Sequence, residues 1–221
     1  MPESLGIWET SAVDDGLIAG DYPLKSKSIT VKSGQGEVKR GTIMGKITKE
    51  LGVVGPGSNT GDGTITAVTM GKDAKHGKYV IKCVEAIADG GRFKVINPDG
   101  NRLDDADVGV AYVSKEVNFT LNDGPADFVV GDTFEINVDN PAGEEWIVSL
   151  AAAVDGSNEL DCIMTHDVDA TSTAVLKSGY ITGDFDQNKL IFGAGHSVGS
   201  LIEEARSKNV YFYDVKVAPG A

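Results

Sequence analysis

The residues most suited to metal binding or catalysis surround His166. In the run C-I-M-T-H-D-V-D-A-T, which spans residues 162–171, this histidine is followed closely by Asp167 and Asp169. An imidazole and neighbouring carboxylates are ligands that divalent metals accept. No second histidine or cysteine lies at a useful spacing, so we expect no metal site here.

A second carboxylate-rich stretch follows the turn signal N-P-D-G at residues 97–100 and contains Asp104, Asp105 and Asp107. A twelve-residue calcium loop needs Gly at its sixth position and Glu at its twelfth, and this stretch has neither in register. We interpret it as a solvated turn.

A third candidate is the glycine-rich segment Gly193–Gly199, which resembles a dinucleotide-binding fingerprint. Its third glycine falls one position late, and 22 residues follow Gly199, too few for the βαβ unit that this mechanism requires. Ser197 is better interpreted as the N-cap of a helix over residues 198–208. We expect Leu201, Ile202 and Ala205 to face inward from that helix.

No nucleophile, base and orienting group occur together, and the three histidines lie far apart. We therefore expect no catalytic residue, no enzyme activity and no cofactor. Cys83 and Cys162 allow a disulfide, but the sequence favours two buried free thiols. No basic residue precedes Lys25 and no apolar run reaches membrane length, so we expect neither a secretory signal nor a membrane span.

Charge is distributed unevenly along the chain. The net charge of −13 excludes a protein that wraps nucleic acid through phosphate contacts. Residues 1–24 hold five acids and no base, whereas residues 25–49 hold seven bases and one acid. The basic stretch is either a solvated face or a patch that meets an acidic partner, such as the N-terminal segment of a neighbouring copy.

The N-terminal segment, residues 1–20, has isolated apolar residues without helix or strand periodicity. It is either a frayed tail or an arm that orders on a partner, and Trp8 favours the arm, because exposed aromatics often anchor interfaces. Ordering it costs about 20–40 kcal/mol of backbone entropy, and its apolar side chains return only about 9–18. It would need main-chain hydrogen bonds to a partner's sheet as well. The predicted anchor residues are Leu5, Ile7, Trp8, Val13, Leu17 and Ile18.

The remaining pattern predicts a mainly β fold, formally α+β, with one substantial helix near the C-terminus. The 28 glycines and many β-branched residues favour short strands joined by turns. Ile29 and Val31 mark the apolar face of an early strand, and residues 210–217 a last strand with Phe212 and Val215 as core contacts. Between them, residues 52–63 read as a glycine-rich linker. Further strands are predicted at 65–70, 79–84, 92–96, 117–121 and 134–138.

Several of these strings together resemble one protein family. They are D-G-S at residues 155–157, the run at 162–171, G-D-Y-P at 20–23 and K-R-G-T-I-M-G-K-I-T at 39–48. This wording resembles the lambda-type head decoration proteins of tailed bacteriophages, with Met164 in place of a leucine. The resemblance implies a β-rich body at residues 21–50 and 145–221, an N-terminal capsid-binding arm at 1–20, and a β-domain of phage structural-protein type inserted at 51–144.

The resemblance also implies a structural virion protein. Such a subunit binds the outer surface of the capsid, cements neighbouring copies of the major capsid protein and stabilises the expanded head against DNA pressure. It implies a homotrimer at or near three-fold positions, with no nucleic-acid or membrane partner. Trimer or capsid contacts are expected at Lys25, Lys27, Lys39 and Arg40. The alternative is a free-standing binding module of a tail or fibre that takes a glycan or host-surface ligand through the insertion.

Overall fold

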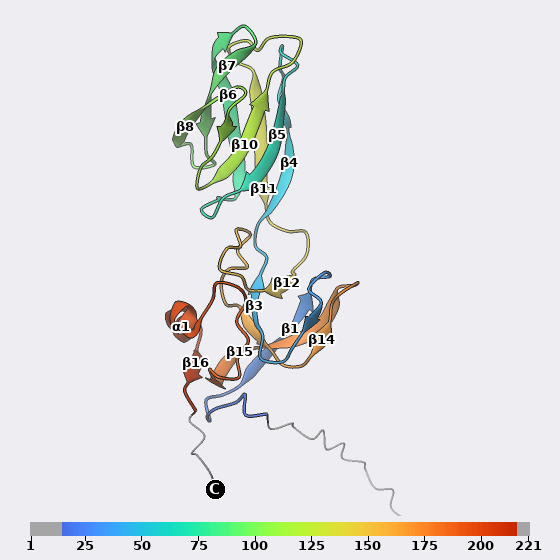
Figure 1. Cartoon of the computed structure of the whole chain (residues 1–221), viewed down its shortest axis with the longest axis vertical. Coiled ribbons are helices and arrows are strands. Elements are labelled where there is room, and N and C mark those ends of the chain that lie inside the picture. The colour runs from blue at the N-terminus through green and yellow to red at the C-terminus, as the bar shows by residue number, and fades with distance from the viewer. Residues whose placement is uncertain (1–14, 216–221) are drawn as a thin grey trace, which may run out of the picture.

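The computed structural model of the chain describes residues 15–215, which form a mainly β fold with one helix near the C-terminus, as the sequence predicts. The strands fall into two groups that lie end to end along the long axis (Figure 1). Residues 15–49 and 140–215 build one group, which we call the body. Residues 50–139 build the other group, which we call the insertion.

Five strands of the body close into a ring. β1 (Lys25–Val31) pairs with β12 (Trp146–Val148), β12 with β3 (Ile43–Lys46), β3 with β13 (Cys162–Met164), and β13 with β15 (Val175–Asp186). Antiparallel pairing of β15 with β1 then returns to the first strand. A closed sheet removes the free edges that an open sheet would present to other chains.

Both faces of β13 are buried, because its side chains alternate between two apolar clusters. Cys162 and Met164 pack with Ile29 in one apolar cluster, whereas Ile163 between them packs in a second cluster with residues of the helix. Successive side chains of a strand point to opposite faces. Gly179 of β15 lies against Cys162, and a Cβ atom on it would come within 2.5 Å of the Cys162 sulfur, so only glycine fits.

Both cysteines are buried free thiols, as the sequence favours. Cys83 belongs to the core of the insertion and Cys162 to that of the ring. Burial raises the pKa of Cys162 to about 12, so this thiol stays protonated at neutral pH.

The helix α1 (Val198–Ser207) begins at the predicted cap. The Ser197 side chain accepts a hydrogen bond from the Ser200 backbone N–H, and Ser200 Oγ accepts one from the Ser197 N–H, which completes a capping box. Leu201 and Ala205 are buried as predicted, and Ile202 is half-buried. The helix therefore covers the second apolar cluster.

The last strand is shorter than predicted. β16 (Val210–Tyr213) runs parallel to β15 and ends opposite Asp186, where β15 itself ends. Phe212 packs against the core, as predicted. The prediction that Val215 is a core contact is wrong: its side chain is 42% exposed, because no strand continues beside it. A two-stranded sheet of β2 (Glu37–Val38) and β14 (Val168–Asp169) completes the body.

The insertion is a sandwich of two sheets. Its five-stranded sheet has the order β4-β11-β6-β7-β8 and its three-stranded sheet the order β5-β10-β9. The two sheets share one apolar core, in which the rings of Phe93, Phe128 and Phe134 lie edge to face or tilted against one another. The bounds are β4 Glu50–Pro56, β5 Thr64–Met70, β6 Gly77–Ile87, β7 Gly90–Ile96, β8 Arg102–Asp107, β9 Ala111–Tyr112, β10 Val117–Asn122 and β11 Thr133–Asp139.

All five strands predicted in this part of the chain are present, each somewhat longer than expected. The prediction of a linker at residues 52–63 is wrong for 52–56, which belong to the edge strand β4. The predicted solvated turn is confirmed at residues 97–101, but from Arg102 on the chain forms the opposite edge strand, β8. Edge strands tolerate Gly, Pro and charged residues, because one side of each faces solvent.

The two ends of the insertion lie side by side, because Glu50 of β4 pairs with Asp139 of β11. We expect that replacing residues 51–138 with a short glycine-rich turn leaves the body folded, since no strand of the ring pairs with a strand of the insertion. Thermal unfolding followed by far-UV circular dichroism checks this. Loss of the cooperative transition in the shortened chain would contradict it.

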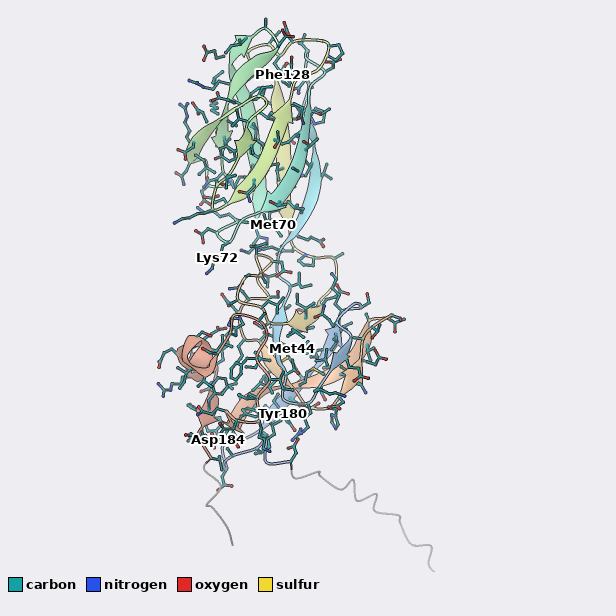
Figure 2. The ribbon with its side chains drawn as sticks, viewed as in Figure 1. Met44, Met70, Lys72, Phe128, Tyr180 and Asp184 are labelled. Atoms are coloured by element: carbon teal, nitrogen blue, oxygen red, sulfur yellow. The ribbon has the colours of Figure 1, made fainter. Side chains whose placement is uncertain are left out.

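Asp132 joins loops of the insertion near Phe128, at the end far from the body (Figure 2). It is 2% exposed, and its carboxylate accepts backbone N–H groups of Thr60 at 2.9 Å, Gly61 at 3.0 Å and Val129 at 3.1 Å. Burial alone would raise the pKa of Asp132, but the three hydrogen bonds outweigh burial and the pKa is lowered.

We expect Asp132→Asn to destabilise the insertion by about 1–3 kcal/mol at neutral pH, because an amide cannot accept all three hydrogen bonds. The folded pKa lies below the unfolded value of about 4, so the stabilisation is complete above that value and is lost as the pH falls through the folded pKa. Urea unfolding across this acidic range should show the difference from wild type shrinking. Asp104→Asn, at an exposed position of β8, is the matched control and should change little.

Candidate binding end of the body

The predicted arm enters the described residues at Asp15, and we call residues 15–20 the arm root. Leu5, Ile7, Trp8 and Val13 lie outside the described residues. Leu17 is 1% exposed and packs with Ile43, Phe185 and Leu190 in the core. Its neighbour Ile18 forms a β-bridge to Phe185.

The arm root pairs with the end of β15 through a single antiparallel β-bridge. The Ala19 N–H donates to the Asp184 carbonyl oxygen at 3.0 Å, and the Asp186 N–H donates to the Leu17 carbonyl oxygen at 2.9 Å. The prediction that Leu17 anchors a partner is therefore wrong, because its side chain is buried in the body's own core. The burial of Leu17 could not be predicted from the sequence, because an isolated Leu-Ile pair has no periodicity that indicates pairing with a distant strand.

Arg40 makes a second attachment of the arm root, through hydrogen bonds of its guanidinium group. Its Nε donates to Asp15 Oδ2 at 2.8 Å, and its Nη1 donates to the Thr165 carbonyl oxygen at 2.8 Å and to the Tyr180 hydroxyl at 3.0 Å. Burial disfavours the charge on Arg40, yet Asp15 and Tyr180 outweigh burial and raise its pKa. Burial likewise opposes the charge on Asp15, but Arg40 and the Leu17 N–H lower the pKa of that carboxyl.

Two further predicted contact residues are also engaged within the chain. Lys27 lies 2.6 Å from Asp161, and Lys39 lies 3.0 Å from Glu37 and 3.2 Å from Asp167. Lys25 is exposed and, among the described residues, has no carboxylate partner. Lys49 donates to the Ala74 carbonyl oxygen and also has no carboxylate partner among the described residues. A protein that binds this basic stretch would therefore have to compete with internal carboxylates at every base except Lys25 and Lys49.

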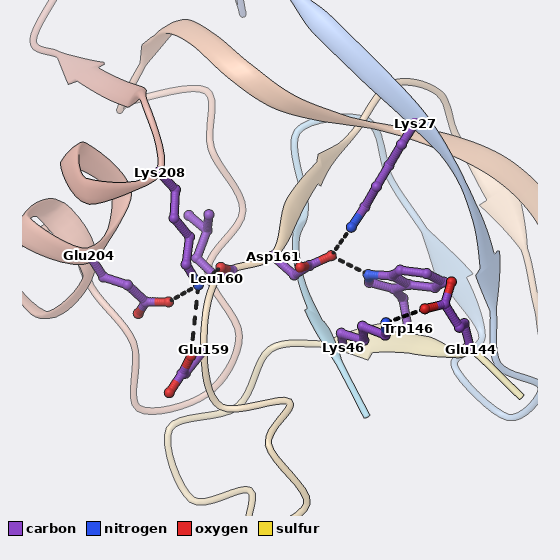
Figure 3. A network of polar contacts seen from close by, with 9 residues as sticks. All are labelled: Lys27, Lys46, Glu144, Trp146, Glu159, Leu160, Asp161, Glu204 and Lys208. Carbon is purple, nitrogen blue, oxygen red and sulfur yellow. Dashed lines mark hydrogen bonds and ion pairs between the residues drawn. The ribbon is translucent and has the colours of Figure 1, made fainter. Parts of the chain in front are cut away.

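The body also contains a polar network around Trp146, the first residue of β12 after the insertion (Figure 3). The indole N–H donates to Asp161 Oδ2, which also accepts from Lys27. The ammonium groups of Lys27 and Lys46 lie 4.8 Å and 5.5 Å from the ring centroid, and Lys46 pairs with Glu144. These contacts fix the point at which the chain re-enters the ring, so we assign them a structural role.

A separate set of contacts in the same view ties the end of α1 to the neighbouring loop. Lys208 Nζ donates to the Leu160 carbonyl oxygen and pairs with Glu204 at 2.8 Å and Glu159 at 3.7 Å (Figure 3).

At the opposite end from the insertion, the structure buries a carboxylate that the sequence analysis missed. Asp184 of β15 is 7% exposed, and its Oδ2 accepts the Tyr22 N–H at 3.0 Å (Figure 2). A Cβ atom at Gly20 would come within 2.3 Å of Asp184 Oδ2, so Gly20 is required for this approach. The G-D-Y-P string at residues 20–23 packs around Asp184, which explains why glycine occurs at its first position.

The side chains around His166 that could bind a metal or catalyse a reaction form hydrogen bonds within the body instead. Asp167 accepts the Arg40 N–H, Asp169 accepts the Thr171 N–H, and His166 Nδ1 lies 2.8 Å from Thr165 Oγ1. Neither carboxylate is grouped with His166 as a metal site. Ser149 and His196 are 3.2 Å apart, but Ser149 is 0% exposed, so a substrate could not reach it.

Three carboxylates that the sequence analysis did not connect, Asp89, Asp123 and Asp127, have oxygens within 4.8 Å of one another on loops of the insertion. Exposed acidic groups often gather without an ion, so we assign no metal to them. A membrane-crossing helix, which needs both length and an apolar sequence, does not occur in residues 15–215.

Comparisons with known proteins leave the family open. No family model matches the sequence, and no curated protein matches it at a significant level. Two crystal structures of FlgL from Xanthomonas campestris align with 45% and 48% of this chain at 16% identity, with TM-scores of 0.30 and 0.31. The alignments span 32% of each FlgL chain. Superposition this weak carries no argument about fold or function, and the resemblance to decoration proteins stays a prediction.

We expect Arg40→Ala to accelerate hydrogen exchange at the Ala19 amide roughly tenfold or more, because charged hydrogen bonds that hold the arm root are lost. Arg40→Lys should be intermediate, since one ammonium group cannot reach Asp15, Thr165 and Tyr180 together. Native-state exchange read by mass spectrometry measures both. Lys39→Ala, which removes exposed ion pairs only, is the control. Equal exchange in Arg40→Ala and wild type would show that this ion pair does not hold the root.

Proposed function

We propose that this chain is a capsid decoration subunit, which binds the outer surface of an expanded phage head and cements neighbouring shell proteins. The observation that carries the proposal is that the arm root and the insertion lie at opposite ends of the molecule. The arm root lies at the end of the body opposite the insertion (Figure 1). An arm that starts there can engage a surface while the insertion points away from that surface.

The attachment of the arm root supports this role. A subunit that cements a shell must transmit force from its anchor to its body. Leu17 in the core, the hydrogen bonds to β15 and the Arg40–Asp15 ion pair join the root to the ring at three kinds of contact. Load on the segment before Asp15 therefore reaches the closed ring without a loose hinge.

The residues that carry the family resemblance lie in the body, and some of them form strands of its ring. Asp155 Oδ1 accepts the Ser157 N–H and hydroxyl and so fixes the D-G-S turn. The run at residues 162–171 supplies β13 and β14. Lys39 to Thr48 supplies Arg40 and β3. The sequence motifs that resemble the decoration family thus all lie in the body. This supports the interpretation that the insertion is an extra domain added to a decoration-protein body.

The alternative of a glycan-binding module is less favoured. Glycan sites generally need an exposed aromatic platform, and the tyrosines of the insertion are Tyr79 and Tyr112. Both are buried, at 0% and 6% exposure, and the four phenylalanines of the insertion are at most 2% exposed. The insertion therefore has no aromatic surface to offer a sugar ring.

Co-sedimentation with empty, expanded capsids of the phage that encodes the chain tests the proposal. We expect saturable binding by the full chain and at least a roughly hundredfold loss when residues 1–14 are removed, because arms linked in one trimer reinforce one another. The deletion stops before Asp15, since removal of Leu17 would damage the core.

The variant with residues 51–138 replaced by a turn is the matched control for a large deletion, and it should still bind. Absence of binding by the full chain would overturn the decoration role. Binding that survives removal of residues 1–14 but is lost without the insertion would move the function to the insertion.

A further inference from the structure

The exposed aromatic side chains of the described residues are confined to one place. Tyr22, at 38% exposure, and Tyr213, at 48%, are the two most exposed Tyr, Phe or Trp side chains of residues 15–215. Both belong to the body at the end that carries the arm root, because Tyr22 binds Asp184 through its N–H and Tyr213 is paired with Asp186.

These side chains share one face of the β15–β16 sheet. Asp184 lies opposite Tyr211 and Asp186 opposite Tyr213, so that all four project to the same side, while Phe185 between the aspartates is buried on the other. The Tyr22 ring contacts the Tyr211 ring edge to face at a centroid distance of 5.0 Å. We call this surface the Tyr–Asp face; its members are Tyr22, Tyr211, Tyr213, Asp184 and Asp186, with Asp21 and Asp214 at its rim.

The charge on this face is not balanced within the described residues. None of Asp21, Asp184, Asp186 and Asp214 forms an ion pair in residues 15–215. Asp184 accepts a single N–H through Oδ2, and its buried Oδ1 has no hydrogen-bond partner in the described part of the chain. Asp186 and Asp214 share the Asn188 side-chain amide. In contrast, most cations of the body have a carboxylate partner.

We propose that the Tyr–Asp face is a second docking surface, which binds a protein surface that presents arginine or lysine side chains. The choice of partner follows from charge: Asp21 and Asp214 are exposed, Asp184 and Asp186 are 7% and 5% exposed, and none of the four is paired with a cation in residues 15–215. Such a group of carboxylates attracts a basic surface and disfavours an acidic one. Tyrosine is enriched at interface cores, and its ring accepts a guanidinium or ammonium group.

This inference rests on the proposed function for the identity of the partner, the shell subunit that the arm engages. The face is continuous with the arm root, since Ala19, Gly20 and Tyr22 all contact Asp184. A subunit anchored by its arm would therefore bring the face against the same shell. Two contacts in a single subunit, one through the arm and one through the Tyr–Asp face, would explain how the body, and not only the arm, is held in register.

The test is co-sedimentation of the full chain with the same expanded capsids over a range of salt concentrations. We expect Tyr213→Ala to weaken binding roughly ten- to thirtyfold, as for an interface anchor. The double variant Asp21→Asn with Asp214→Asn should weaken binding at low salt and flatten its salt dependence. These changes are at exposed positions, so circular dichroism melting should match wild type.

Matched controls lie on the insertion. Val113→Ala removes an apolar side chain that is 78% exposed, and Asp73→Asn with Asp104→Asn removes two exposed charges; both should bind as wild type does. If the full chain binds and the Tyr–Asp variants bind equally well, the second docking surface is overturned while decoration stands. If these variants change self-association in sedimentation velocity but leave capsid binding intact, the face joins copies of this chain and the proposed partner is wrong.

Discussion

The pairing of β1 with β15 is the constraint on which the rest of the body depends. It closes five short strands into a ring, although several of them have only three or four residues and would be marginal in an open sheet. Closure requires the strands to approach closely, which explains why Gly179 faces Cys162 without room for a side chain. It also buries both faces of β13, because one face fills the ring and the other supports α1.

The closed ring explains how the body can carry a large insertion between β3 and β12. These strands are neighbours in the ring, and the insertion begins and ends on paired strands of its own, so the chain leaves and returns at one place. The network of Trp146, Asp161 and Lys27 fixes the return point. The sandwich keeps a separate apolar core, so its folding makes little demand on the geometry of the ring.

The opposite end of the body has a different character. The long strand β15 extends beyond the ring, and there it is flanked by β16 on one side and by the arm root on the other. This extension creates both the attachment of the arm and the Tyr–Asp face. One element thus connects the closure of the ring to the surface that we assign to a partner.

The sequence by itself determined the features that depend on neighbouring residues: the capped helix at Ser197, the turn at Asn97 and the alternating strands of the insertion. Local hydrogen bonds and side-chain period specify these without reference to distant parts of the chain. Tertiary structure alone decided that Leu17 is core, that β4 is a strand and that the Tyr–Asp face exists. Each depends on pairing across many residues, as between Leu17 and Asp186, and neither composition nor local period encodes which distant strand is the partner.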